Sequence, residues 1–342
     1  LRGKSMLTCE AKEMVFSSYA GNIYEVQERA VKKGYFRNCR ALRLPDEGMY
    51  RLYLLDYYIS SGMDRELQNW MEQNFEECFG GRAEAGPFIW PVDYVIGEAE
   101  ENGPASLGLF FCQKQFQSLS EAGSFLLDKN AIPLLLPLFR AVDRLHEQGI
   151  CLNGIEAGQL FFSGQDGKIR VQALHNCIYE DGPGAESRAL MTDGAKYLYQ
   201  EKAFSLPLGS SWKNLSLGTY ARYNDVYSLA SLLFLGLTGR HPLNGRLCDD
   251  QEDEEGRRII YNQTPCFIFD REDRRNEIGQ FEEEQKAISR WEQLPCELKE
   301  LFWQLYEFPV MDASDTEEKA EKLACFRPES WIHVLEQEEK CG

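Results

Sequence analysis

The chain has 342 residues, of which 43% are hydrophobic and 12% aromatic, and this is enough apolar material for ordered cores in two domains. Its net charge of −18 argues against nucleic acid and anionic membranes as partners, because both require concentrated Lys and Arg. No apolar run approaches the ~20 residues that a membrane-spanning helix needs.

Eleven Cys are scattered along the chain without a Cys-x-x-Cys pair, and the four His do not cluster. This pattern predicts reduced, mostly buried thiols and no metal site. The first residues lack the apolar stretch of a secretory signal, so we expect a cytoplasmic protein. Because residue 1 is not Met, we also expect the chain to be part of a longer protein.

The first part of the chain is predicted to be rich in strands. Alternating or continuous apolar residues mark four strand segments, and the first of them is divided by a turn that contains a Gly. These segments are residues 14–26, 39–44, 87–97 and 106–113. Between the second and the third, residues 64–76 place apolar side chains on one face of a helix. Pro91 indicates that the third segment is an edge or bent strand.

The rest of the chain is predicted to be mainly helical. Its segments are an apolar helix at 131–149, a hairpin of two short strands at 159–163 and 168–174, a buried helix at 225–239 and several helices within 286–338. The composition therefore changes near residue 112. We predict a strand-rich N-lobe at 1–112, a helical C-lobe at 113–338 and a short tail at 339–342.

Three stretches resemble the protein kinase-like superfamily. Residues 145–175 resemble its helix E, catalytic loop and following hairpin, residues 224–245 resemble helix F, and residues 326–335 resemble the closing Arg-Pro segment and last helix. The strings "FIWPVDYV", "HPLNG" and "PCFIFDREDRRN" are also similar to a bacterial branch of that superfamily. The resemblance implies an α+β, bilobal fold with a small strand-rich N-lobe that holds one helix and a larger helical C-lobe.

The resemblance also assigns the catalytic positions of this chain. A kinase uses an Asp in the catalytic loop for the substrate hydroxyl, a phosphate-facing Lys two residues on, and a later Asn and Asp for Mg²⁺. These positions are occupied here by Gly154, Glu156, Gln159 and Ala173. The proton acceptor and both metal ligands are therefore replaced, which is typical of a pseudokinase.

The N-lobe also lacks the lysine that grips the ATP phosphates. No Lys occurs between Gly34 and Gln113, so no alignment register supplies one. We expect Arg43 at this position, because an arginine keeps its charge, although its larger fork makes it no simple replacement. Glu66 and Glu72 are both candidates for its helix partner.

The remaining candidate nucleotide residues are Gly21 and Phe111. Gly21 is the only Gly of a stretch that in kinases has two or three, and an ordinary strand turn explains it equally well. Phe111 belongs to the strand that resembles the kinase hinge, where its bulk and that of Phe110 could fill the purine site. We expect no cofactor, with ATP binding in the absence of Mg²⁺ as the alternative.

Two residues resemble parts of the kinase scaffold. Asp225 resembles the buried Asp that braces the catalytic-loop backbone, and a helix N-cap is its alternative role. Arg327 resembles the Arg that pairs with a Glu of the activation segment, for which Glu201 is the candidate. His146 matches a structural position of helix E.

These observations favour a catalytically inactive binding, scaffold or regulatory protein whose partners are other proteins, with no role for nucleic acid or membranes. Two alternatives stay open. One is an atypical enzyme with relocated chemistry, in which Glu156 serves as the base. The other is a nucleotide-binding module without turnover. The acidic stretch 249–255 is predicted to be disordered or to face a partner.

Overall fold

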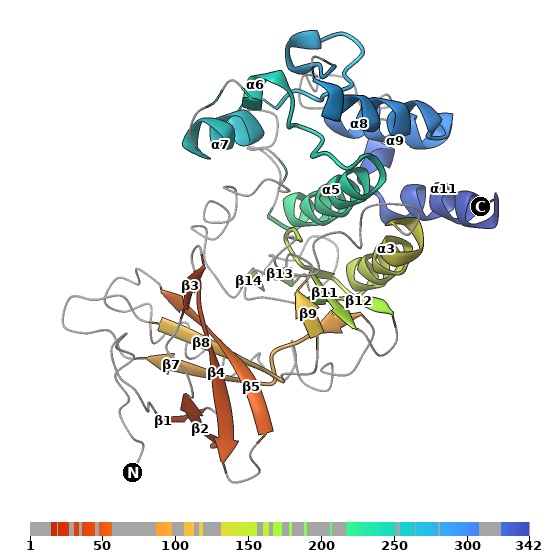
Figure 1. Ribbon diagram of the computed structural model, residues 1–342. Helices are drawn as coiled ribbons and strands as arrows, with labels where there is room; N and C mark the ends of the chain where they lie inside the picture. The colour runs from red at the N-terminus through yellow and green to blue at the C-terminus, as the bar shows by residue number, and fades with distance from the viewer. Residues whose placement is uncertain are drawn as a thin grey trace. The chain divides into compact units, whose positions relative to one another are not determined.

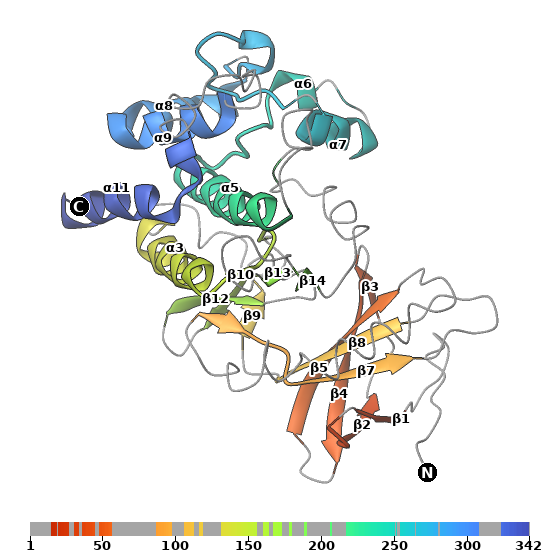
Figure 2. The same ribbon diagram turned by 180° about the vertical axis from the view of Figure 1, so that it is seen from behind.

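A computed structural model divides the chain into two compact units, residues 1–116 with 172–174 and residues 117–171 with 175–342. As predicted, the fold is α+β, with a small strand-rich first unit and a larger, mainly helical second unit (Figure 1; Figure 2). No described helix is long and apolar enough to cross a membrane. The structure describes residues 15–18, 20–26, 31–33, 36–44, 48–56, 87–97, 106–112, 116–118, 131–155, 160–163, 167–172, 178–179, 188–189, 206, 217–249, 251, 254–263, 265–279, 281–307 and 323–341.

The first unit is built on an antiparallel sheet, as the alternating segments predict. Its strands lie in the order β1 (Val15–Ser17), β2 (Ile23–Val26), β4 (Phe36–Leu44), β5 (Gly48–Asp56), β8 (Ser106–Cys112) and β7 (Asp93–Gly97), and β3 (Val31–Lys33) also pairs with β4. The predicted segment 87–97 is split into β6 (Phe88–Ile89) and β7. Pro91 lies in the break, because a proline has no backbone N–H for a ladder. The predicted helix 64–76 lies outside the described residues.

One buried carboxylate joins the two ends of this sheet. Asp93, at the start of β7, is only 1% exposed and accepts hydrogen bonds from the Ser18 hydroxyl (2.5 Å), the Asn22 amide (2.8 Å) and the Tyr24 hydroxyl (3.2 Å). β1 and β2 stand at the opposite end of the strand order from β7. The first hairpin is therefore fixed to the far edge of its own sheet. Burial, and then the negative charge of Asp93, raise the pKa of Tyr24, which keeps this hydroxyl a donor.

We predict that Asp93→Ala destabilises the first unit by about 2–4 kcal/mol, because it leaves buried hydroxyls without an acceptor and removes charge-assisted hydrogen bonds. Urea unfolding monitored by tyrosine and tryptophan fluorescence measures the loss. Glu25→Ala, on the partly exposed surface of β2, is the control and should have little effect. An unchanged unfolding midpoint for Asp93→Ala would contradict the role assigned to this carboxylate.

The second unit contains the elements expected from the kinase resemblance, in the expected order. Its main elements are α3 (Ala131–Glu147), β10 (Ile150–Cys151), the hairpin β11 (Leu160–Ser163) and β12 (Lys168–Gln172), β13 (Ile178–Tyr179), β14 (Arg188–Ala189), α5 (Leu217–Thr238), α6 (Arg246–Asp249), α7 (Glu254–Gln263), α8 (Glu282–Gln293), α9 (Cys296–Glu307) and α11 (Pro328–Cys341). Short 3-10 helices occupy Arg274–Asn276 and Leu323–Phe326, and β9 (Phe116–Ser118) lies where the chain passes from one unit to the other.

The core of this unit surrounds α5, which packs against α3 and α8. Phe234, fully buried on α5, has ring centroids of several aromatic side chains within 5.2–6.4 Å: those of Phe267, Phe269, Trp291, Phe302 and Tyr306. α11 closes the core on the other side, where Trp331 stacks on Phe139 of α3 at 5.8 Å. Large aromatic side chains from distant segments therefore hold α5 in place.

The strings "HPLNG" and "PCFIFDREDRRN" lie against each other. The Asn276 amide donates to the backbone oxygens of Leu243 (3.0 Å) and Cys266 (2.7 Å), and its side-chain oxygen accepts from the Leu247 N–H (3.0 Å). A Cβ on Gly245 would lie 2.0 Å from the Asn276 backbone oxygen, so only glycine permits this approach.

One prediction about the helices needs revision. α5 begins at Leu217 and not near residue 225, so Asp225 lies more than two turns inside the helix and is not its N-cap. The first turns of α5 contain Gly218, Thr219 and Asn224, which have low helix propensity, so the packing of the unit decides the start.

The acidic stretch 249–255 is described at its ends, where Asp249 closes α6 and Glu254 begins α7. Its predicted disorder or contact with a partner stays a prediction.

Candidate functional site

The candidate site is the loop after α3, whose backbone N–H groups are hydrogen-bonded to the carboxylate of Asp225. Asp225 is completely buried on α5. Its Oδ2 accepts the Leu152 N–H at 2.8 Å and its Oδ1 accepts the Gly154 N–H at 2.7 Å. The Nε2 of His146, at the end of α3, lies 3.0 Å from the same carboxylate. One side chain thus connects α3, the loop and α5.

The backbone of this loop adopts conformations that most residues avoid. Asn153 has a φ of 59° and Gly154 a φ of 96°. Such conformations cost about 1–3 kcal/mol each in residues other than glycine and persist only where the surroundings enforce them. The two hydrogen bonds to Asp225 lie on both sides of Asn153 and supply that enforcement. The loop is therefore held in its conformation by Asp225, and Gly154 contributes no side chain to it.

The space beside Gly154 is already occupied. A Cβ built there would lie 2.6 Å from the Nδ2 of Asn224, 3.2 Å from its Cγ and 3.3 Å from the Oγ of Ser228. Asn224 is 1% exposed and its amide donates to the Asn153 backbone oxygen at 2.9 Å. A side chain at position 154 would have to displace a buried, hydrogen-bonded amide.

Asn224 also fixes a second segment. Its Oδ1 accepts the N–H of Leu206 at 2.7 Å, and the Tyr220 hydroxyl donates to the Leu206 backbone oxygen at 2.9 Å. Leu206 is fully buried, so both of its backbone polar groups are satisfied by side chains of α5. Asn224, Tyr220 and Leu206 were not singled out from the sequence. A polar Asn-Asp pair inside an apolar helix is the only signal of them there.

His146, Cys151 and Asp225 form the one group among the described residues whose possible metal-ligating atoms converge, within 4.8 Å of one another. All three side chains are buried. However, Asp225 already accepts two backbone N–H groups and lies against His146. A cation would compete with the hydrogen bonds that hold the loop, so the arrangement fits a structural brace better than a metal centre.

Several predicted positions lie outside the described residues: Glu156, Gln159, Ala173, Glu201, Glu66 and Glu72. The hairpin of β11 and β12 that follows the loop is described, with Leu160 opposite Val171. Arg327 is exposed between the 3-10 helix Leu323–Phe326 and α11. Burial raises the pKa of the Tyr223 hydroxyl, and the positive charge of Arg327 acts in the opposite direction.

The candidate nucleotide residues of the first unit have other contacts. Gly21 lies in the β1–β2 turn, whose neighbours Ser18 and Asn22 donate to Asp93, so a carboxylate already uses these donors. Arg43 on β4 places its guanidinium 4.9 Å from the centre of the Tyr50 ring, a cation–π contact. Phe111 on β8 pairs with Arg51 of β5.

Comparison with known proteins adds a similarity of fold alone. No protein family and no curated protein matches the chain. Among solved structures, the crystal structure of Rad53 residues 1–466 in complex with AMP-PNP matches with a TM-score of 0.48 and 12% identity. The match covers 83% of this chain and 60% of that one. At this identity the similarity says nothing about activity, ligands or partners.

We predict that Asp225→Asn destabilises the second unit by about 2–3 kcal/mol, since an amide can accept only on one side and turns N–H groups toward a backbone donor. Urea unfolding gives the free energy. The control is Asp143→Asn on α3, where burial, and then the charges of Glu329 and Glu147, raise the pKa of the carboxyl. Removing that charge should leave stability equal or higher. Equal losses for both variants would contradict the assigned role of Asp225.

Proposed function

We propose that this protein is a pseudokinase, a catalytically inactive protein kinase-like protein that acts as a binding, scaffold or regulatory module for other proteins. We also propose that it belongs to the bacterial branch that its sequence strings resemble. The observation that supports inactivity best is the filled space beside Gly154. The position assigned to the catalytic Asp has no side chain, and Asn224 occupies the place where one would begin.

The physical reason is that phosphoryl transfer depends on positioned charge. The catalytic carboxylate orients the substrate hydroxyl, and the metal ions neutralise the charge that develops on the phosphoryl group. Here a glycine stands at the first position, and Gln159 and Ala173 stand at those assigned to the metal ligands. Alanine offers no ligand atom in place of the Asp carboxylate, and glutamine carries its amide on a side chain one carbon longer than that of the Asn it replaces.

The set of hydrogen bonds that supports the loop, in contrast to the catalytic positions, is complete. Asp225 still holds Leu152 and Gly154 through their N–H groups, and His146 joins the same carboxylate. A loop that is kept in shape without its reactive groups supports a role in which the scaffold itself is the functional part. Such a protein would act through its surfaces, which is why we propose protein partners.

We predict that the protein transfers no phosphate from ATP in the presence of Mg²⁺, and that Gly154→Asp does not create transfer. Gly154→Asp should also destabilise the protein by about 2–4 kcal/mol, from backbone strain and the displaced Asn224 amide. The measurement is transfer of labelled phosphate to the protein and to general protein substrates, together with urea unfolding.

The double variant Gly154→Asp/Asn224→Gly separates the two effects. It removes the Asn224 atoms that a residue-154 Cβ would meet at 2.6 and 3.2 Å, whereas the Ser228 Oγ at 3.3 Å and the positive φ remain. The double variant should therefore be less strained around position 154 than Gly154→Asp while it remains inactive. Mg²⁺-dependent transfer by the pure wild-type protein, lost on substitution of Asn153, would refute the proposed function.

We further predict that any thermal stabilisation by ATP is equal with and without Mg²⁺, because the metal-ligand positions are replaced. A ligand that binds only the folded state raises the unfolding midpoint according to its occupancy. Thermal unfolding over a series of ATP concentrations tests this, and Arg43→Ala then asks whether Arg43 contributes. A stabilisation that requires Mg²⁺ would contradict the prediction.

A further inference from the structure

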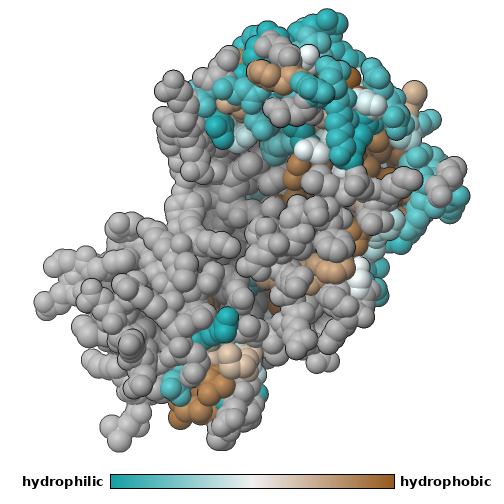
Figure 3. Space-filling model, in the orientation of Figure 1, coloured by the Kyte–Doolittle hydropathy of each residue, from teal (hydrophilic) through white to brown (hydrophobic). Residues whose placement is uncertain are grey.

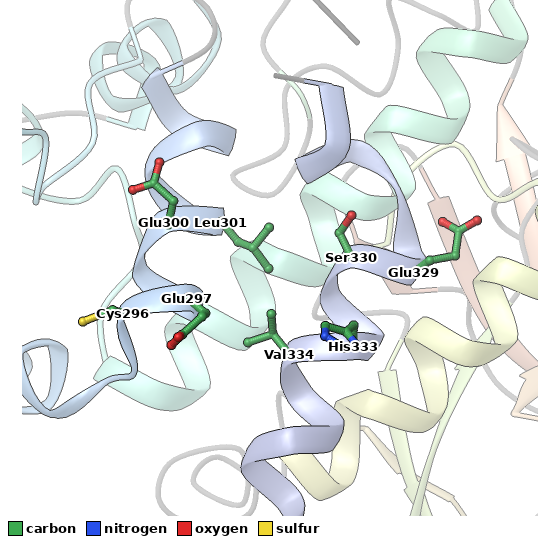
Figure 4. Close-up of a pocket in the computed structure, with 8 residues that line it drawn as sticks. All are labelled: Cys296, Glu297, Glu300, Leu301, Glu329, Ser330, His333 and Val334. Atoms are coloured by element: carbon green, nitrogen blue, oxygen red, sulfur yellow. The ribbon is translucent and has the colours of Figure 1, made fainter. Parts of the chain in front are cut away.

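A hollow lies on the helical unit between α9 and α11 (Figure 4). Its volume is about 760 Å³, and it is lined by the first two turns of each helix: Cys296, Glu297, Glu300 and Leu301 from α9, and Glu329, Ser330, His333 and Val334 from α11. We refer to it as the α9–α11 groove. It belongs entirely to the second unit, and none of its lining residues belongs to the loop braced by Asp225.

The floor of the α9–α11 groove is apolar. Leu301 and Val334 project into the space between the two helices (Figure 4). Leu301 is 9% exposed and Val334 is half-buried, so both combine support from the core with some access from outside. Burial of an apolar side chain there would favour binding by about 25 cal/mol for each Å² of apolar surface that is removed from water.

The walls of the groove are acidic. Glu297 and Glu300 lie along α9 and Glu329 lies on α11 (Figure 4). Glu300 forms an ion pair with Arg271 at 3.2 Å, and Arg271 forms a second ion pair with Glu307 at 2.6 Å. Among the described residues, neither Glu297 nor Glu329 forms an ion pair. The charge of Glu329 also acts on Asp143 of α3, where it adds to burial in raising the pKa of that carboxyl.

We propose that the α9–α11 groove is a docking site for a short basic segment of a partner protein, in which one apolar side chain is flanked by Lys or Arg. The apolar residue occupies the floor between Leu301 and Val334. The flanking cations meet Glu297 on one wall and Glu329 on the other. This assignment rests on the proposed binding role and gives it a partner chemistry.

Charge and geometry favour this occupant over two others. A second copy of the chain would bring a net charge of −18 toward an acidic groove, and like charges oppose such an association. A single metal ion does not fit either, because the groove side chains are not among the described groups whose ligand atoms converge. On the face that Figure 3 shows, much of the described surface of the helical unit is hydrophilic.

The size of the groove limits the length of the bound segment. Each wall spans six residues, 296–301 and 329–334, which is about 9 Å along a helix. That length accommodates an anchor residue and its immediate neighbours. The expected interaction is therefore a weak, motif-like contact whose association rate depends on charge.

The test uses fluorescence anisotropy with a labelled short peptide that has a central Leu flanked by two Lys on each side. The matched peptide carries Glu in place of each Lys. The protein is the full chain as wild type and as the variant Glu297→Gln/Glu329→Gln. A control variant, Glu272→Gln/Glu282→Gln, changes the net charge equally outside the groove, and Glu282 lies in the first turn of α8. Glu282→Gln thus also matches one of the two first-turn acids that the groove variant removes, in its effect on helix stability.

We expect the Lys peptide to bind and the Glu peptide not to bind. The groove variant should weaken binding about tenfold, as expected for two lost charge pairs, and the control variant should change it by less than about twofold. Val334→Lys should abolish binding while the thermal midpoint shows that the fold is kept. Equal weakening by both double variants would mean general attraction to an acidic chain and would overturn the proposal, as would no binding of the Lys peptide.

Sedimentation of the free protein adds a second decisive outcome. Concentration-dependent dimerisation that is lost in Val334→Lys would assign the groove to a second copy of the chain and overturn the proposal. The phosphate-transfer assay is independent of these results. Absence of both peptide binding and transfer rejects the groove assignment alone, whereas transfer that depends on Mg²⁺ rejects the inactive role whether or not the peptide binds.

Discussion

The helical unit depends on one buried negative charge. Asp225 lies in the middle of α5 without exposure to water, and a charge in that place is tolerated only because several donors surround it. Those donors are the N–H groups of Leu152 and Gly154 and the ring of His146. The charge thus requires the loop to stay in its strained form, and the loop in turn supplies the donors that make the charge acceptable. Each feature therefore stabilises the other.

The packing of the same unit is separate from the loop that Asp225 holds. Aromatic side chains around Phe234 and the contact of α11 with α3 through Trp331 and Phe139 form its core. None of these side chains belongs to the loop at residues 152–154. Substitutions in the loop are therefore expected to leave this packing intact.

The sequence predicted the parts of this structure that local patterns encode. Apolar runs that end in Gly located α3 and α5, a turn sequence located the β11–β12 hairpin, alternation located β4 and a short apolar run located β8. The start of α5 was missed because weak helix formers such as Gly218 and Thr219 become helical only through tertiary packing. The roles of Asp93 and Asn224 were also missed. The side-chain hydrogen bonds that Asp93 accepts join residues separated by 69 to 75 positions, and those of Asn224 join residues separated by 18 and 71 positions. No local pattern carries information on partners so distant, and only the resemblance pointed to Asp225.

The position of Asn224 has a consequence for sequence change in this chain. Because its amide fills the space beside Gly154 and also binds Leu206, a side chain introduced at position 154 alone would produce a less stable protein. Replacement of the asparagine alone would release the loop and Leu206. Substitutions at positions 154 and 224 are therefore coupled, and their effects on stability are expected to be non-additive.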